Sequence, residues 1–149
     1  MPTDRTELRR ELRRGLAATA PYLLSHHTPA EYHRCHRLSV AGRTVRLCAR
    51  CSGVYPGIAL GVTAFLLGVG RGAWFPLVAV GPLPALVDWT ATTFTDRRGH
   101  NAVRTATGLL LGAAYGVAVP WFLTTLAPAL LAVAVWYGAL AAAGLWLSE

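Results

Sequence analysis

The final part of the chain contains 43 consecutive residues without a charged side chain, from residue 105 to residue 147. Because about 20 apolar residues span the hydrocarbon core of a bilayer, this stretch is long enough to cross it twice. Ala127-Pro128 offers a place for the chain to reverse, since proline is favoured in the first turn of a helix. The stretch therefore predicts two membrane-spanning helices, over residues 105–126 and 128–147.

Two more apolar runs lie upstream of this stretch. Residues 52–69 are uncharged, and residues 74–94 carry a single charge, at Asp88. In the whole chain 54% of the residues are hydrophobic and 14% are charged, whereas about a quarter are charged in a typical soluble domain. A soluble helical protein would also need polar outer faces, which these runs lack. The sequence predicts an all-α membrane protein with four transmembrane helices.

Glycine and proline indicate how these helices pack. Glycine recurs at every fourth position in the first and third runs, at Gly53, Gly57, Gly61, Gly108, Gly112 and Gly116. This spacing strips one helix face of side chains, so it predicts close packing and leaves homo-oligomerisation open. In the second run, Gly81, Pro82 and Pro84 predict a kink or a local opening, because proline cannot donate a helical hydrogen bond.

Arginine counts predict the orientation of the chain. Ten of the fourteen basic residues lie in the first 51 positions, the loop after the first run holds only Arg71, and the loop after the second holds Arg97 and Arg98. Because short basic loops remain cytoplasmic, we expect both termini in the cytoplasm. Lysine is absent, and the abundant Ala, Gly, Val and Arg are typical of a GC-rich prokaryotic genome. We therefore expect a multi-pass protein of a prokaryotic cell membrane.

The basic head suggests which partners the chain meets. Its arginines flank apolar spans and do not alternate with aromatic residues, so we expect no nucleic acid partner. The expected partners are the lipid bilayer and its anionic lipid head groups. The apolar stretch that follows Arg14 is brief, and we expect no removable leader.

The first 51 residues form a predicted cytoplasmic head, and residues 52–149 form the transmembrane domain. Within residues 4–16, Leu8, Leu12 and Leu16 recur at helical spacing among arginines, which predicts an amphipathic helix in the membrane interface. Residues 32–51 predict a compact knuckle instead. It consists of a short strand, a turn at Ala41-Gly42, a second short strand and a Cys-x-x-Cys motif.

The knuckle contains all three cysteines of the chain, Cys35, Cys48 and Cys51. On the reducing side of a membrane they are not expected to form a stable disulfide. A hairpin could bring them to one tetrahedral zinc or iron ion, which then needs a fourth ligand. His33 shares a strand face with Cys35 because side chains alternate along a strand, and the adjacent His26-His27 pair is a looser alternative.

A second polar group surrounds the only charge in the predicted spans. Asp88 needs a partner because an unpaired carboxylate inside a membrane is costly, and Arg50 or Arg104 lies within reach. With Asn101 they predict a polar cluster at the cytoplasmic membrane face. The cluster is either a pocket for a head group, ion or proton, or a structural Asp–Arg pair that joins two helices.

Several of these residues match a known pattern in type and order. They are Cys35-His36, Gly42, the block Cys48-Ala49-Arg50-Cys51-Ser52-Gly53-Val54-Tyr55, Gly57, Asp88, Asn101, Arg104 and Thr107-Gly108. In this pattern the chain resembles the small prokaryotic membrane proteins grouped as domain of unknown function 2085, over about residues 30 to 120. The resemblance implies a shared architecture, and it favours His36 over His33 as the fourth ligand. At Leu38-Ser39-Val40 the chain departs from the family pattern.

Three functions follow as hypotheses. The first is a membrane protein with a zinc or iron site formed by Cys35, His36, Cys48 and Cys51. The second is a membrane thiol–disulfide oxidoreductase that uses Cys48 and Cys51. The third is a protein that acts on an anionic lipid or phosphate through Asp88 and the arginines near it. The chain has no nucleotide-binding loop and no nucleophile motif, so no particular reaction is indicated.

Overall fold

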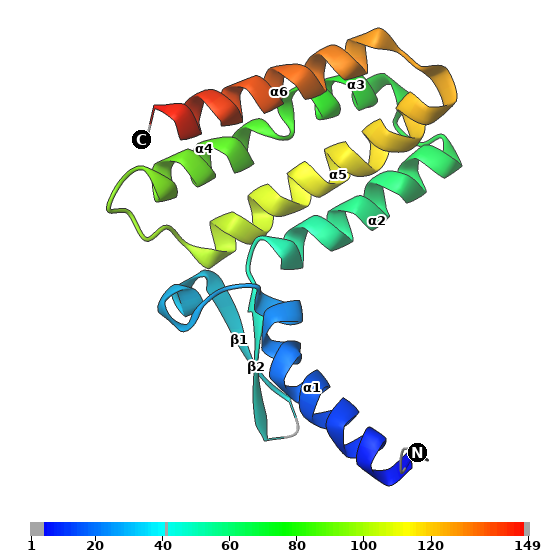
Figure 1. The fold of residues 1–149 in the computed structure, drawn as a ribbon. Helices are drawn as coiled ribbons and strands as arrows, with labels where there is room; N and C mark the ends of the chain where they lie inside the picture. The colour runs from blue at the N-terminus through cyan, green and yellow to red at the C-terminus, as the bar shows by residue number, and fades with distance from the viewer. Residues whose placement is uncertain (1–4, 41, 148–149) are drawn as a thin grey trace. The chain divides into compact units, whose positions relative to one another are not determined.

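The computed structural model describes residues 5–40 and 42–147, and the chain divides into two compact units, Met1–Cys48 and Ala49–Glu149. The first unit contains helix α1 (Arg5–Ser25), the short 3-10 helix η1 (Pro29–Arg34), and strands β1 (Cys35–Val40) and β2 (Arg43–Cys48). The second unit contains helices α2 (Cys51–Leu67), α3 (Arg71–Val80), α4 (Leu83–Thr93), α5 (Asn101–Thr125) and α6 (Pro128–Trp146) (Figure 1).

Strands β1 and β2 form an antiparallel hairpin, in which Cys35 pairs with Cys48 at the open end. Gly42 has a φ of 74°, a left-handed conformation that glycine adopts without a steric penalty. The predicted strand, turn and strand are therefore confirmed, although Ala41 of the predicted turn lies outside the described residues.

Helix α1 packs against β2 within the first unit. The helix is longer than the predicted segment 4–16, because it continues through an apolar stretch to Ser25. Leu8, Leu12 and Leu16 are all more than half exposed, so the predicted leucine stripe lies on the surface of the helix. The stripe is thus available to a membrane interface.

In the second unit, α2 and α5 run parallel and side by side (Figure 1). A Cβ atom at Gly53 would collide with the carbonyl oxygen of Thr105, and a Cβ at Gly112 would collide with that of Val54. The glycines of both helices therefore face each other and permit backbone contact. The predicted close packing of these two helices is confirmed.

The run predicted as the second span is not one helix. It is divided into α3 and α4, of 10 and 11 residues, by Gly81 and Pro82, where the sequence predicts a kink. Pro82 and Pro84 have no N–H and so cannot donate to the carbonyl groups one turn earlier, at Val78 and Val80. Between these two, the carbonyl oxygen of Ala79 accepts a hydrogen bond from the Tyr137 hydroxyl of α6 at 2.7 Å.

Two of the described helices, α5 and α6, are long and apolar enough to cross a membrane. Only 33% of the most apolar window of α5 and 6% of that of α6 are buried within the protein, whereas the core helix of a soluble protein would be mostly buried. Helix α2 is apolar but has 17 residues. Of the four predicted transmembrane helices, two are therefore found as single helices long enough to span a membrane. The other two are not, because α2 is short and the second run is broken.

Candidate metal centre

The histidine pair His26-His27 follows directly on α1. The helix ends at Ser25, and His26 has a φ of 36°, a left-handed conformation that is uncommon for a residue other than glycine. Thr28 is then extended and η1 begins at Pro29, so the helix cannot continue. Because α1 packs against β2, this abrupt ending brings both imidazoles to the end of β2, where Cys48 lies.

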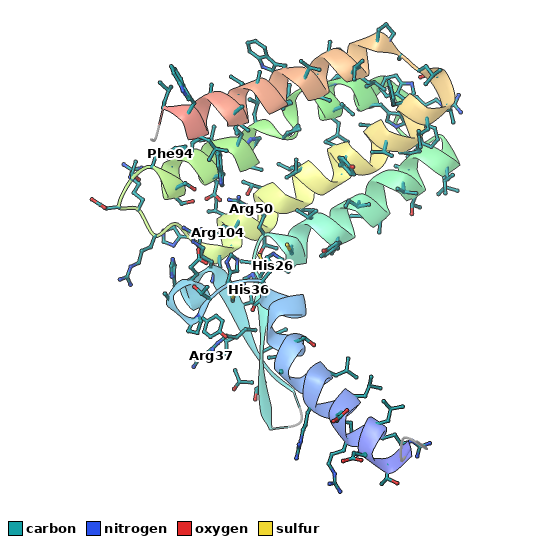
Figure 2. All side chains as sticks on the ribbon, in the orientation of Figure 1. His26, His36, Arg37, Arg50, Phe94 and Arg104 are labelled. Atoms are coloured by element: carbon teal, nitrogen blue, oxygen red, sulfur yellow. The ribbon has the colours of Figure 1, made fainter. Side chains whose placement is uncertain are left out.

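His26, His27 and Cys48 form a group with metal-binding geometry. Each residue offers one ligand atom, a ring nitrogen or the Cys48 sulfur, and the three atoms lie within 4.8 Å of one another. Cys48 is buried, His27 is half-buried, and His26 is exposed at the end of α1 (Figure 2). Two imidazole nitrogens and one thiolate are ligands that zinc accepts, and a tetrahedral site would need one more.

Glu31 orients His27 from the η1 helix. Its carboxylate lies 3.6 Å from Nδ1 of His27 and also 3.4 Å from the guanidinium of Arg34. A carboxylate on one ring nitrogen leaves the other, Nε2, for a metal, which is a common outer-shell arrangement around metal-bound histidine. Burial lowers the pKa of His27, and Glu31 offsets part of this effect. The neutral imidazole, which is the form that binds metals, is therefore favoured.

Cys35 is the remaining cysteine of the first unit. It lies directly opposite Cys48 in the hairpin register, so both side chains project from the same face. Both residues are buried. Burial raises the pKa of the Cys35 thiol, and the neighbouring Cys48 raises it further while Arg46 lowers it. None of the three cysteines forms a disulfide.

The other predicted ligands are not part of this group of three. His36 pairs with Leu47 and therefore projects from the opposite face of the hairpin to Cys35 and Cys48. His33 is exposed on η1. Cys51 begins α2 and belongs to the second unit. The structure thus gathers around Cys48 a set different from the predicted Cys35, His36, Cys48 and Cys51, and that set stays a prediction.

The second unit holds the polar group predicted around Asp88. The guanidinium of Arg50, the residue before α2, forms an ion pair and a hydrogen bond with the Asp88 carboxylate on α4. Arg104 is buried at the start of α5, where it donates to Oδ1 of Asn101 at 3.0 Å and to the carbonyl oxygen of Arg98 (Figure 2). Asp88 and Arg50 therefore join two helices, while Arg104 stabilises the loop before α5.

Hydroxyl groups extend this polar group to the beginning of α2. Thr105 of α5 donates to the carbonyl oxygen of Ala49 at 2.8 Å, and Ser52 donates to the same oxygen at 2.8 Å. This carbonyl lies at the helix start and accepts hydrogen bonds from both helices. The parallel pair α2 and α5 is thus fixed by polar contacts at its first turn and by glycine contacts beyond it.

Sequence comparison places the chain in a family. A family model described as "Predicted membrane protein (DUF2085)" matches residues 32–118, which include Cys35, Cys48, Asp88 and Arg104. The matched segment begins after His26 and His27, so the two histidines were not indicated by the family pattern. Neither the curated proteins nor the solved structures contain a match to the chain. The chain belongs to the DUF2085 family of predicted membrane proteins.

Proposed function

We propose that this protein is a membrane protein whose N-terminal head binds a zinc ion through His26, His27 and Cys48, with Cys35 as the fourth ligand. The observation that carries the proposal is the approach of the three ligand atoms to within 4.8 Å of one another. Cys35 is the candidate fourth ligand because it lies opposite Cys48 on the same face of the hairpin. All four residues belong to the first unit.

A metal would add to the few buried side chains that the structure describes in the first unit. Among the described side chains of the first unit, only Ser25, Cys35 and Cys48 are buried. Small units bury a small share of their apolar surface, and small domains of this kind commonly depend on a metal. The buried side chains lie beside the candidate ligands, so an ion there would act as the core.

Two nitrogen and two sulfur ligands favour zinc over iron. Zinc accepts a tetrahedral set of two cysteines and two histidines in structural sites. Iron–sulfur clusters are held mainly by cysteine thiolates, and the head has too few of these. Such a site would be closed and structural, and the proposal does not make the protein an enzyme.

The proposal is tested by purifying the full chain in mild detergent and measuring bound metal by mass spectrometry. The expected result is one zinc ion per chain. His26→Ala and Cys48→Ser should each lower zinc affinity by at least about tenfold, since even outer-shell partners of a metal contribute that much. A wild-type protein without metal, or metal content unchanged by Cys48→Ser, would overturn the proposal.

Two control variants separate this ligand set from the one predicted from sequence. His36→Ala should leave zinc binding unchanged, because His36 projects from the other face of the hairpin. Cys51→Ser should also leave it unchanged, whereas Cys35→Ser should weaken it. The reverse pattern, with losses in His36→Ala and Cys51→Ser, would favour the set Cys35, His36, Cys48 and Cys51.

We further propose that α3 and α4 together form one crossing, so that the protein crosses the membrane four times. The two helices follow one another along nearly one line and cover residues 71–93, close to the ~20 residues that a crossing requires (Figure 1). The composition supports a prokaryotic cell membrane, and the arginine distribution supports a position of both termini in the cytoplasm.

A thiol–disulfide oxidoreductase has less support. Reactive thiols have a depressed pKa, whereas burial raises the pKa of Cys35. Cys48 and Cys51 would have to form the redox pair, and a cytoplasmic position disfavours disulfide formation. Recovery of a Cys48–Cys51 disulfide from protein trapped with acid in intact cells would revive this alternative.

A further inference from the structure

The second unit contains an elongated apolar cleft of about 710 Å³. Most of its lining comes from α4, α5 and α6, with Val78 from α3, and the lining on α5 extends from Leu111 to Leu123, a rise of about 18 Å along the helix. Its volume is in the range of ligand pockets, about 300 to 1,000 Å³. Because α5 and α6 are the two candidate membrane spans, the cleft would lie at the depth of the lipid chains if both cross the bilayer.

One end of the cleft differs from the rest. Among the described residues that line the cleft, only Arg50 is charged, and it lies beside the beginning of α5, where its backbone carbonyl approaches Gly108. The lining at the far end is formed by residues such as Val78, Phe122 and Leu130, which carry no polar side chain. The cleft is therefore amphipathic along its length, with a guanidinium group at one end and apolar side chains toward the other.

Arg50 has capacity for a second anion although it pairs with Asp88. A guanidinium carries five N–H donors, and the contact with the Asp88 carboxylate uses only part of them. The Arg50 side chain is 26% exposed, whereas that of Asp88 is 7% exposed. An approaching group would thus meet the arginine first, and phosphate is an anion that guanidinium groups bind well.

We propose that this cleft binds one anionic phospholipid of the surrounding bilayer, with an acyl chain along α5 and α6 and the phosphate against Arg50. The shape supports a chain because the cleft is long and nearly all apolar. The charge supports an anionic head group because the single charged side chain in the lining is basic. This inference is independent of the metal site in the head.

The test compares two alanines of α6 that are both exposed. Ala134 lines the cleft, whereas Ala132 does not, so Ala134→Trp should fill the cleft while Ala132→Trp serves as its matched control. Full-length protein is placed in nanodiscs of equal phosphatidylglycerol and phosphatidylcholine, released into mild detergent, and analysed by native mass spectrometry. Wild type and Ala132→Trp should retain one phosphatidylglycerol per chain, and Ala134→Trp should retain about tenfold less because it loses the contacts of the chain.

A second variant tests the head-group contact without leaving a buried charge unpaired. Arg50→Gln combined with Asp88→Asn keeps polar groups at both positions but removes both charges. This variant should still retain lipid and should lose the preference for phosphatidylglycerol over phosphatidylcholine. A preference that stays unchanged would overturn the assignment of Arg50 to the phosphate.

Three other kinds of outcome would overturn the proposal. One is a wild-type protein that retains no lipid, or an Ala134→Trp variant that retains as much as wild type. Another is a dimer that Ala134→Trp converts to a monomer, which would assign the cleft to a second copy of the chain. The third is retention of a neutral isoprenoid from cell membranes in place of phospholipid, since such a compound would need no cationic end.

Discussion

The guanidinium of Arg50 donates a hydrogen bond to the carboxylate of Asp88, a residue 38 positions later in the chain. Arg50 immediately precedes α2, and Asp88 lies in the middle of α4, so the ion pair connects two helices that are not adjacent in sequence. Asp88 is buried, and a charge in such a place is retained only if a partner neutralises it. The pair therefore fixes the position of α4 in the second unit.

Removing one partner of this pair should destabilise the protein more than removing both. Arg50→Leu leaves the Asp88 charge buried without its cation, which should lower the free energy of unfolding by about 3 kcal/mol. The double variant Arg50→Leu/Asp88→Leu should recover much of this loss, because it leaves no charge to bury. Denaturant unfolding of the four proteins in detergent measures the coupling. Additive effects of the two single variants would contradict the pairing.

A methyl group added to a glycine should have opposite effects at two positions. A Cβ at Gly57 would collide with the carbonyl oxygen of Leu109, so Gly57→Ala should lower the free energy of unfolding by about 1 to 3 kcal/mol. Gly138, within α6, has open space around a Cβ, so Gly138→Ala should be neutral or stabilise the helix by up to about 1 kcal/mol. Thermal unfolding of both variants provides the comparison. Equal losses of stability at both positions would contradict the interpretation that Gly57 is needed for backbone contact between α2 and α5.

The hydroxyl of Tyr137 should contribute measurably to stability. It donates to Ala79, near the break between α3 and α4, so Tyr137→Phe should cost about 1 kcal/mol through the lost hydrogen bond. Tyr115 is exposed and offers the same substitution as a control, for which no loss is expected. Unfolding in detergent measures both. Equal stability of Tyr137→Phe and wild type would show that water or another donor serves Ala79.

Much of the fold was predictable because lipid imposes simple rules on sequence. Uncharged runs located α5 and α6 within a few residues, and the spacing of Gly53 and Gly112 with their neighbours indicated that both helices pack closely, although not that they pack against each other. Pro82 indicated that the second run is interrupted. It did not indicate whether the helix is kinked or ends there, since a proline can do either. Which of the two occurs depends on tertiary partners such as Tyr137.

The candidate site was less predictable than the fold. The alternation of side chains along a strand correctly predicts that His36 and Cys35 project from opposite faces of the hairpin, because this alternation is a local property of the strand. The approach of His26 to Cys48 depends instead on α1 packing against β2, a contact between segments that local patterns do not encode. The same holds for Asp88: the sequence left Arg50 and Arg104 as equal partners, and only the tertiary arrangement selects Arg50.

Membrane orientation provides the last prediction, because it links the arginine counts to the fold. In a background with all three cysteines replaced by serine, Gly72→Cys and Asp96→Cys place single thiols in exposed positions in the first turn of α3 and after α4. If α3 and α4 form one crossing, the two positions lie on opposite sides of the membrane. A thiol reagent that cannot cross lipid should label Gly72→Cys in intact cells and Asp96→Cys only after permeabilisation, since the arginine-rich side remains cytoplasmic. Permeabilised cells, in which both variants should react, serve as the control. Labelling of both positions in intact cells would exclude the crossing, and labelling of Asp96→Cys alone would reverse the orientation.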